Sequence, residues 1–291
     1  MKTNDMWHEQ LLICPDCNGS LILTSDNVHC ENCNFKSNNP KDLRAKNPSQ
    51  INLDFHRTFK NLDPQTTLKT VSISPPKIQY KGPKALRESS AFMSLIMEYF
   101  QKPCQVLDLG CGPKDQLTPI AHLGHLYVGV DYSNVAADYL IDAHSIPFQA
   151  SSFDCVFSYA VLEHLHNPFI AIQEINRVLK PGGIFIGTVS QGEPFHDSYF
   201  HMTPWGFISL INSVPSLKIE RLWASMDTIK SLSRMGRYPR LIKSVLAQVD
   251  KLHESFPIMS PRKMKWSTSD LALDKLYRAG SICFLVEKLN I

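Results

Sequence analysis

Long apolar runs are absent from this sequence of 291 residues. Met1 to Gln10 are mostly polar, and no stretch approaches the ~18 consecutive apolar residues that cross a bilayer. We therefore expect a cytoplasmic protein with no membrane span. Because 43% of the residues are hydrophobic, the chain can bury the core of one large domain and of a smaller one.

Cysteine occurs only eight times, and four of the eight form two Cys-x-x-Cys pairs. Each pair lies on one tight turn, so the two turns together predict a tetrahedral Zn²⁺ site. Four thiolates leave no open position for water, which indicates a structural metal; two disulfide bonds are the alternative. The predicted ligands are Cys14, Cys17, Cys30 and Cys33. The cysteines expected to be buried free thiols in a reducing compartment are Cys104, Cys111, Cys155 and Cys283.

A glycine-rich turn follows the apolar run 106–109. Gly110 and Gly112 let the backbone adopt conformations closed to other residues and approach a ligand closely. The third glycine of the dinucleotide pattern G-x-G-x-x-G is missing, because Asp115 stands in its place. This absence argues against a dinucleotide and its pyrophosphate.

Two carboxylates near the turn favour a nucleoside without phosphates. Asp131 ends the second apolar run, 126–130, and an acid there can accept hydrogen bonds from both hydroxyls of a ribose. Asp108 would repel a phosphate and attract an amino group. S-Adenosylmethionine (SAM) has a ribose, an adenine and an α-amino group but no phosphate, so we expect it to bind across the strand ends of an open α/β sheet.

Six sequence blocks in one order resemble class I SAM-dependent methyltransferases with a type 11 domain, over roughly residues 86–289. The blocks are VLDLGCGP (106–113), GVDYS (129–133), DAHSIPF (142–148), SFDCV (152–156), LEHL (162–165) and EINRVLKPGG (174–183). The resemblance implies an α/β fold with a Rossmann-like, doubly wound, seven-stranded sheet whose last strand is antiparallel. It also implies a transferase that methylates its acceptor with SAM.

The same resemblance implies the residues that bind the cofactor. The glycine turn would hold the methionine part, Asp131 the ribose, and Asp142 with Ala143 the adenine, while Tyr159 or its neighbours would close over the sulfonium. The complete set of expected SAM-binding residues is Asp108, Gly110, Gly112, Asp131, Tyr132, Asp142, Ala143 and Tyr159.

The sequence departs from the family pattern at two places. Lys114 stands where many members have glycine, so the turn is expected to open differently there. Asp131 and Asp142 are closer in sequence than in most members, and residues 132–137 are too few for a crossover helix. We therefore expect a third strand at 138–141 that is reached by a loop.

The N-terminal segment from Leu11 to Cys33 resembles the small zinc ribbon known as a tRNA-methyltransferase activator. We expect this ribbon over residues 8–55, with short strands at 21–24 and 27–29, and a proline-rich linker over 56–85. The resemblance implies a role in substrate capture or stability.

Hydrophobic periodicity places the remaining elements in a methyltransferase domain over residues 86–291. We expect a helix at 85–101, a strand after Pro103, and an amphipathic helix at 168–179. The other predicted strands are 153–159, 184–190, 217–223 and 281–287.

A basic insertion at about 224–270 lies between the last two predicted strands. Nine basic and three acidic residues between Ala224 and Lys265 give it a net charge of +6. Such an excess can hold an anionic partner, or it can be the solvated face of a helix. The basic residues are Lys230, Arg234, Arg237, Arg240, Lys243, Lys251, Arg262, Lys263 and Lys265.

The loop 191–204 follows a predicted strand at the edge where open α/β sheets bind ligands. It contains His196 and His201, and a histidine can remove the proton of a hydroxyl acceptor near neutral pH. These two are the preferred catalytic bases, with His164 or His166 as alternatives; the other interpretation is that these histidines only satisfy loop backbone groups.

Three functions are consistent with the sequence. The leading one is methyl transfer to oxygen of a small-molecule or glycan-like acceptor, because the loop 191–204 contains neither an Asn-Pro-Pro-Tyr motif nor a cysteine in a Pro-Cys context, as nucleic-acid methyltransferases often do. The second is an rRNA or tRNA methyltransferase that holds RNA with the zinc ribbon and the basic insertion. The third is an inactive scaffold that acts as a binding module. The sequence leaves the oligomeric state open.

Overall fold

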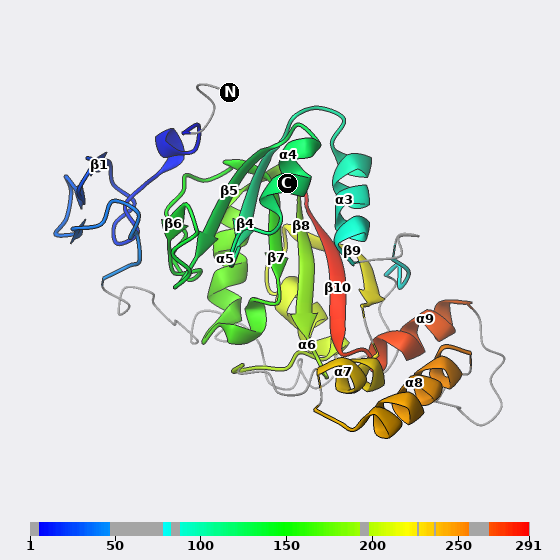
Figure 1. Ribbon diagram of the computed structural model, residues 1–291. Helices are drawn as coiled ribbons and strands as arrows, with labels where there is room; N and C mark the ends of the chain where they lie inside the picture. Colours follow the sequence, from blue (N-terminus) through cyan, green and yellow to red (C-terminus); the bar gives the residue numbers. More distant parts are fainter. Residues whose placement is uncertain are drawn as a thin grey trace, which may run out of the picture.

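The computed structural model contains a three-stranded and a seven-stranded sheet (Figure 1). The structure describes residues 6–46, 78–82, 88–192, 198–225, 227–235, 237–255 and 268–290. Within these ranges, none of the helices combines the length and apolar character needed to cross a bilayer.

The large sheet has the order β6-β5-β4-β7-β8-β10-β9. Neighbouring strands run parallel from β6 to β8, whereas β10 runs antiparallel to both β8 and β9. This topology confirms the predicted α/β sheet with an antiparallel last strand. The strands are β4 (Gln105–Leu109), β5 (Leu126–Asp131), β6 (Tyr139–Leu140), β7 (Phe153–Tyr159), β8 (Leu179–Ser190), β9 (Leu217–Ala224) and β10 (Ser281–Lys288).

Helices cover both faces of the sheet. The helices α3 (Glu88–Tyr99) and α4 (Leu117–His122) bury Phe92, Leu95 and Ile120 on one face. The other face is covered by α5 (Pro168–Val178) and α6 (Pro204–Asn212). The predicted helix at 168–179 is confirmed: Pro168 suits its first turn, and the Asn167 side chain accepts hydrogen bonds from two backbone amides of that turn.

The short connection between β5 and β6 contains no helix, as the spacing of Asp131 and Asp142 predicts. Asp138, at the start of β6, closes the connection with its carboxylate. Its Oδ2 accepts a hydrogen bond from Gly129 N at 2.8 Å, and its Oδ1 forms an ion pair with Lys114 Nζ at 2.7 Å. Lys114 adopts φ = +63°, a conformation that favours glycine, so the ion pair offsets backbone strain at this departure from the family pattern.

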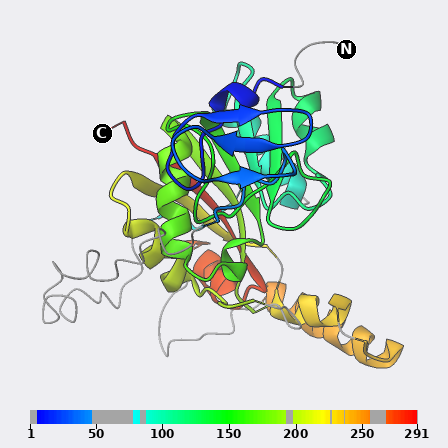
Figure 2. The same ribbon diagram turned by 90° about the vertical axis from the view of Figure 1, so that its left-hand side faces the viewer.

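The N-terminal module contains η1 (Glu9–Leu11) and an antiparallel sheet of β1 (Leu21–Leu23), β2 (Val28–Cys30) and β3 (Lys36–Ser37). Figure 2 shows this ribbon in front of the large sheet, on the side of β6. Leu140 N donates to Lys41 O at 2.7 Å, and Leu43 N donates to Leu140 O at 2.9 Å. These bonds cover the exposed edge of the two-residue strand β6.

The predicted domain boundaries fall largely outside the described residues. Residues 47–55 of the predicted ribbon are not described, and only 78–82 of the predicted linker are. There, Leu222 N donates to Gln79 O at 2.9 Å, so this short piece lies along β9.

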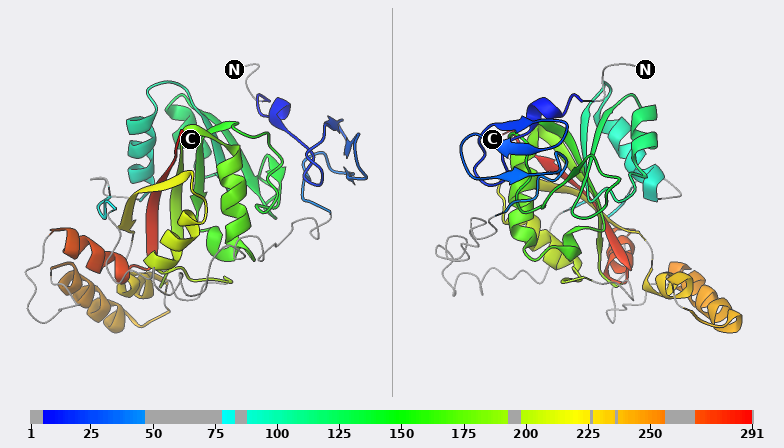
Figure 3. Two further views of the ribbon diagram at one scale, coloured as in Figure 1. Left: turned by 180° about the vertical axis from the view of Figure 1, so that it is seen from behind. Right: turned by 60° about the vertical axis from the view of Figure 1, so that its left-hand side comes forward.

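Among the described residues between β9 and β10, the basic insertion forms three helices (Figure 3). They are α7 (Thr228–Met235), α8 (Arg240–Ser255) and α9 (Thr268–Tyr277). Arg278, between α9 and β10, joins the two ends of the insertion through ion pairs with Asp227 at 2.7 Å and Asp274 at 3.1 Å. The predicted basic residues Arg262, Lys263 and Lys265 lie outside the described residues.

Candidate active site and metal centre

A cavity of about 530 Å³ opens at the carboxyl ends of β4, β5 and β7. Five of the predicted SAM-binding residues line it. This position, outside the strand ends of a doubly wound sheet, is where such folds bind ligands. The five residues are Gly110, Asp131, Tyr132, Asp142 and Ala143.

The glycine turn forms the floor of the cavity. Gly110 and Gly112 have φ of +75° and +52°, the left-handed region that other residues rarely adopt. Gly110 N and Cys111 N both donate to Val130 O, at 2.8 and 2.9 Å. A side chain at Gly110 would collide with Val161, so the close approach of these two segments also requires glycine.

The carboxylate of Asp131 is fixed by backbone amides. Its Oδ2 accepts a hydrogen bond from Gly112 N at 3.0 Å, and its Oδ1 accepts from Ser133 N and Asn134 N at 2.9 Å each. Since each carboxylate oxygen offers about two acceptor sites, Oδ2 keeps one for a ligand hydroxyl. The carboxylate is thereby positioned before any ligand binds.

Asp142 forms a second fixed carboxylate together with His144. Its Oδ1 accepts from His144 N at 2.9 Å and lies 2.6 Å from His144 Nδ1. Asn167 N donates to His144 Nε2 at 3.1 Å, so Nδ1 carries the proton of the neutral ring. Burial raises the pKa of Asp142, but the hydrogen bonds from His144 outweigh burial and hold that pKa below its ordinary value. Both bonds use Oδ1, which leaves Oδ2 for an amino group of a ligand.

Asp108 lies under the turn and not among the residues that line the cavity. It is only 2% exposed, and Tyr127 Oη donates to its Oδ2 at 2.7 Å. Side chains alternate along a strand, so Asp108 faces the same side as Val106, toward α3 and α4. Burial raises the pKa of Asp108 to about 7.

Two other predicted residues also lie outside the lining of the cavity. Gly112 acts through its backbone amide on Asp131, and Tyr159 is 45% exposed at the end of β7. The contacts with SAM proposed for Asp108, Gly112 and Tyr159 therefore stay predictions.

Another part of the cavity wall contains His164, His166 and Tyr199. His164 ends the short helix η3 (Leu162–His164), and the ring of His166 packs against that of Tyr199 with centroids 3.9 Å apart. Buried Glu163 joins this wall to β8, because its Oε1 accepts a hydrogen bond from Ser190 N at 3.0 Å.

The histidines preferred from the sequence are placed differently. His196 lies outside the described residues, and His201 is exposed without lining the cavity. The structure brings the alternatives, His164 and His166, to the cavity instead. The sequence does not predict Tyr199 as a site residue, although Tyr199 belongs to the loop 191–204 that the sequence indicates as part of the site.

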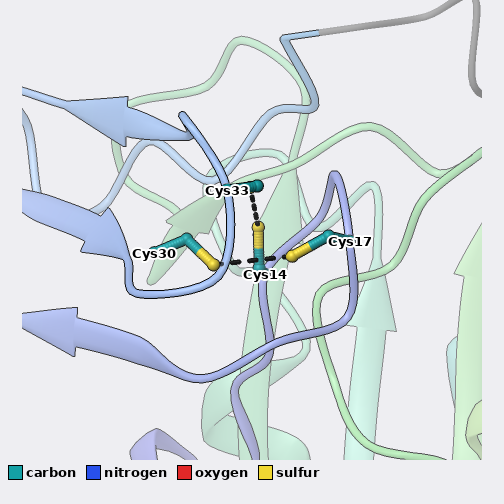
Figure 4. A group of neighbouring side chains, drawn as sticks. All are labelled: Cys14, Cys17, Cys30 and Cys33. Atoms are coloured by element: carbon teal, nitrogen blue, oxygen red, sulfur yellow. Dashed lines mark hydrogen bonds between the residues drawn. The ribbon is translucent and has the colours of Figure 1, made fainter.

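The four predicted metal ligands converge on one point (Figure 4). All four Sγ atoms lie within 4.8 Å of one another, with 3.6 Å between Cys14 and Cys33 and 3.5 Å between Cys17 and Cys30. Four thiolates about 2.3 Å from one zinc ion would be about 3.8 Å apart, so the donor set fits tetrahedral zinc. These four cysteines are free thiols, and so are the four predicted to be buried thiols.

The ribbon contacts two walls of the cavity from outside. The Arg44 guanidinium lies over the Tyr132 ring, 5.4 Å from its centroid, and Arg44 Nη1 donates to Tyr132 O at 3.4 Å. Next to His144, which lines the cavity, Ser145 Oγ donates to Pro15 O at 2.6 Å, and Pro15 lies inside the first Cys-x-x-Cys turn. The four-cysteine cluster and the candidate cofactor site are therefore neighbours.

Comparison with known proteins agrees with this geometry. Residues 107–187 match the family model described as a methyltransferase domain. The chain therefore contains a methyltransferase domain. The match includes the glycine turn, Asp131 and Asp142, and it supports SAM as the ligand of the cavity.

Relatives of the methyltransferase domain include the ubiquinone biosynthesis O-methyltransferase of Dinoroseobacter shibae. That protein is 28% identical over 196 residues, which are 62% of this chain and 74% of the relative. An uncharacterized 37.1 kDa protein in transposon TN4556 of Streptomyces fradiae is 29% identical over 147 residues. This alignment covers 44% of this chain and spans 41% of the relative's length.

A solved structure with a similar fold is the 1,6-didemethyltoxoflavin-N1-methyltransferase of Burkholderia thailandensis. It is 14% identical and has a TM-score of 0.44, and the comparison covers 70% of this chain and 78% of that one.

Proposed function

We propose that this protein transfers the methyl group of SAM to an oxygen of a small-molecule or glycan-like acceptor. The observation that carries the proposal is a single cavity lined by two chemically different groups of side chains. Asp131 and Asp142 present fixed carboxylates, which we assign to a cofactor end, and His164, His166 and Tyr199, which also line the cavity, form the proposed acceptor end. The name of the Dinoroseobacter shibae relative, an O-methyltransferase, supports oxygen as the atom methylated.

The residues of the cofactor end have a positioning role in this proposal. Bound SAM would supply a methyl group on a positively charged sulfur, and transfer is an in-line displacement that depends on alignment. Asp131 Oδ2 would accept a hydrogen bond from a ribose hydroxyl, and Asp142 Oδ2 would accept one from the adenine amino group. Tyr132 and Ala143 would bound the adenosine from two sides.

The acceptor end would remove the proton of the acceptor hydroxyl. Imidazole is suited to this step because its ordinary pKa lies near neutral pH. We assign the base to the pair His164 and His166, which line the cavity. His144 is unsuited, because its Nδ1 is bonded to Asp142 and its Nε2 accepts from Asn167 N.

We also propose that the four-cysteine centre holds a structural Zn²⁺ ion. Backbone amides of Asn32 and Phe35 lie 3.3 and 3.4 Å from the Sγ atoms of Cys30 and Cys33, bonds that suit thiolate ligands. The metal would stabilise the ribbon, and the ribbon would support the cavity walls at Tyr132 and Ser145.

The test uses methyl-labelled SAM, the pure protein and a cell extract divided into RNA, protein, lipid–polysaccharide and small-molecule fractions. We expect label in the glycan or small-molecule fraction, and none with Asp131→Ala, whose zinc content should be unchanged. Label in RNA would instead support an RNA methyltransferase, and no label above the Asp131→Ala control in any fraction would support an inactive scaffold.

Once an acceptor is known, the base can be assigned by single variants. His164→Asn or His166→Asn should lower kcat at least about a hundredfold. His201→Asn is the matched control, because this histidine is exposed outside the cavity. A loss with His201→Asn alone would move the base to the loop 191–204.

A further inference from the structure

The helix α8 exposes an apolar stripe to solvent. Leu241 is 77% exposed, Val245 55% and Leu252 58%, and Ile242 lies at the margin of the same face. At 100° per residue, the first three side chains fall within about 40° of one another around the helix axis. The opposite face packs along α7 and buries Asp250. The helix thus has one covered face and one uncovered apolar face.

Basic residues lie along one flank of the stripe, because at 100° per residue Arg240 and Lys251 fall about 80–100° to one side of Leu241. The one acid of α8 whose side chain the structure describes is Asp250, which is buried 3.9 Å from Lys230 Nζ and does not offset the charge at the surface. Figures 2 and 3 show α8 projecting away from the sheet, with its outer side clear of the other described elements. The basic residues on and next to α8 are Arg237, Arg240, Lys243 and Lys251.

We propose that α8 docks on the surface of an anionic lipid bilayer. A helix with an apolar stripe beside basic side chains lies in the interface plane, with its apolar side chains among the acyl chains and its cations at the headgroups. Each Lys or Arg near an anionic surface adds attraction that falls off within a Debye length. The stripe supplies insertion and the basic residues supply charge complementarity.

Other occupants suit this surface less well. A stable contact between two copies uses about 20–30 residues a side, whereas the stripe offers four side chains on one helix. A two-fold contact would also bring the same basic residues face to face. RNA pairs cations with aromatic side chains that stack on bases, but the exposed residues of the stripe are aliphatic.

The position of α8 relates this surface to the cavity. The insertion leaves β9 at Ala224 and returns to β10 at Ser281, and Gln191 after β8 donates to Tyr277 O and Ala279 O. The insertion therefore lies at the carboxyl end of the parallel strands, the end at which the cavity opens. Docking would present that end of the sheet to molecules held at the membrane surface. The inference goes beyond the proposed function and does not depend on it.

The test is flotation of the full-length, zinc-loaded protein with vesicles. One set contains phosphatidylcholine alone, and the other also contains phosphatidylglycerol. We expect binding to the anionic vesicles only, and weaker binding as salt concentration rises. Leu241→Asp should weaken binding roughly tenfold or more, because it removes an inserted side chain. Arg240→Glu should weaken binding and reduce its salt dependence.

The matched control is Met97→Asp, which changes a 46% exposed apolar residue on α3. It should bind as the unchanged protein does, and circular dichroism should show that all variants are folded. Failure of the unchanged protein to bind anionic vesicles would overturn the proposal, as would equal binding by Leu241→Asp. Sedimentation velocity provides another decisive outcome: a dimer lost in Leu241→Asp would make the stripe an interface between copies.

Discussion

The two halves of the large sheet are built differently. On the side of β4, β5 and β6, strands are two to six residues long, β4 and β5 carry the carboxylates Asp108 and Asp131, and Asp138 directly precedes β6. On the side of β8, β9 and β10, strands are eight to twelve residues long, and the first six residues of β10 are all buried. Most of the backbone pairing between strands therefore lies in the half with β8, β9 and β10. The carboxylates that face or support the cavity lie in the half with β4, β5 and β6.

This difference shows where the sheet is stable and where it needs support. The long strands pack against an apolar core that includes Phe185, Phe207 and Phe284. The ring centroid of Phe284 lies 4.7 Å from that of Phe185 and 4.5 Å from that of Phe207. The short strands instead rely on hydrogen bonds from backbone amides to carboxylates and on the N-terminal ribbon at their edge. We call the half with β4, β5 and β6 the cofactor half. Unfolding the ribbon should consequently affect the cofactor half and leave the half with β8, β9 and β10 intact.

The largest effect is expected from breaking the metal centre with Cys17→Ser. Loss of one thiolate should remove the zinc, because metal binding and folding of such a small module are coupled. With the ribbon unfolded, the contacts to Ser145 and Tyr132 are lost, and the Kd for SAM should rise about tenfold. Metal analysis and titration calorimetry measure the two quantities. Binding to anionic vesicles should be retained, because α8 belongs to the other half.

The control for this variant is Cys104→Ala, a buried thiol that takes no part in the four-cysteine cluster. It should keep one zinc per chain and bind SAM normally. Zinc-free Cys17→Ser protein that bound SAM as tightly as the unchanged chain would show that the ribbon does not support the cavity.

Local sequence patterns were sufficient to predict the cofactor half. Each signal used there is local in the sequence: the strand–turn pattern at Gly110, the acid Asp131 at a strand end, and the short spacing to Asp142. The structure confirms the expected strands. The spacing within each Cys-x-x-Cys pair is also a local signal, and it predicts the cluster of four cysteines that the structure shows.

Contacts between residues far apart in the chain could not be predicted from the sequence patterns. Arg44 and Tyr132 are 88 residues apart, and no pattern within either segment specifies their contact. The side to which Asp108 points depends on strand register, since a change of one residue moves every side chain to the other face. The sequence therefore suggested a ligand contact, whereas the structure pairs Asp108 with Tyr127.

A second prediction concerns the pH dependence of stability in the cofactor half. Burial raises the pKa of Asp108 from 3.8 to about 7 in the folded chain. The folded state thus holds this proton more tightly, so its stabilising effect is complete below about pH 4 and is lost as pH rises through about 7. Asp108→Asn removes this dependence. Between pH 4 and 8, the unchanged protein should lose roughly 2–4 kcal/mol of unfolding free energy relative to Asp108→Asn.

Urea denaturation at several pH values, without SAM, measures this difference. The control is Asp26→Asn, which removes an exposed carboxylate from the N-terminal ribbon and should run parallel to the unchanged protein. Parallel curves for Asp108→Asn would mean that Asp108 is ionised in the folded chain throughout this range.

The smallest effect is expected from Arg44→Gln, which removes the side-chain contact between the ribbon and Tyr132 while leaving the ribbon folded. Arg44 forms an ion pair with Asp42 at 2.7 Å and lies over the Tyr132 ring, but its side chain is 36% exposed, so water weakens both interactions. A cation–π contact at such a site contributes about 0.5–1 kcal/mol, and the Kd for SAM should rise about two- to fivefold with zinc retained. Lys41→Gln is the control, because Lys41 acts through its backbone carbonyl. If calorimetry gave Arg44→Gln the tenfold loss expected of Cys17→Ser, the side chain alone would carry the support, and the backbone bonds along β6 would only cover the edge of the sheet.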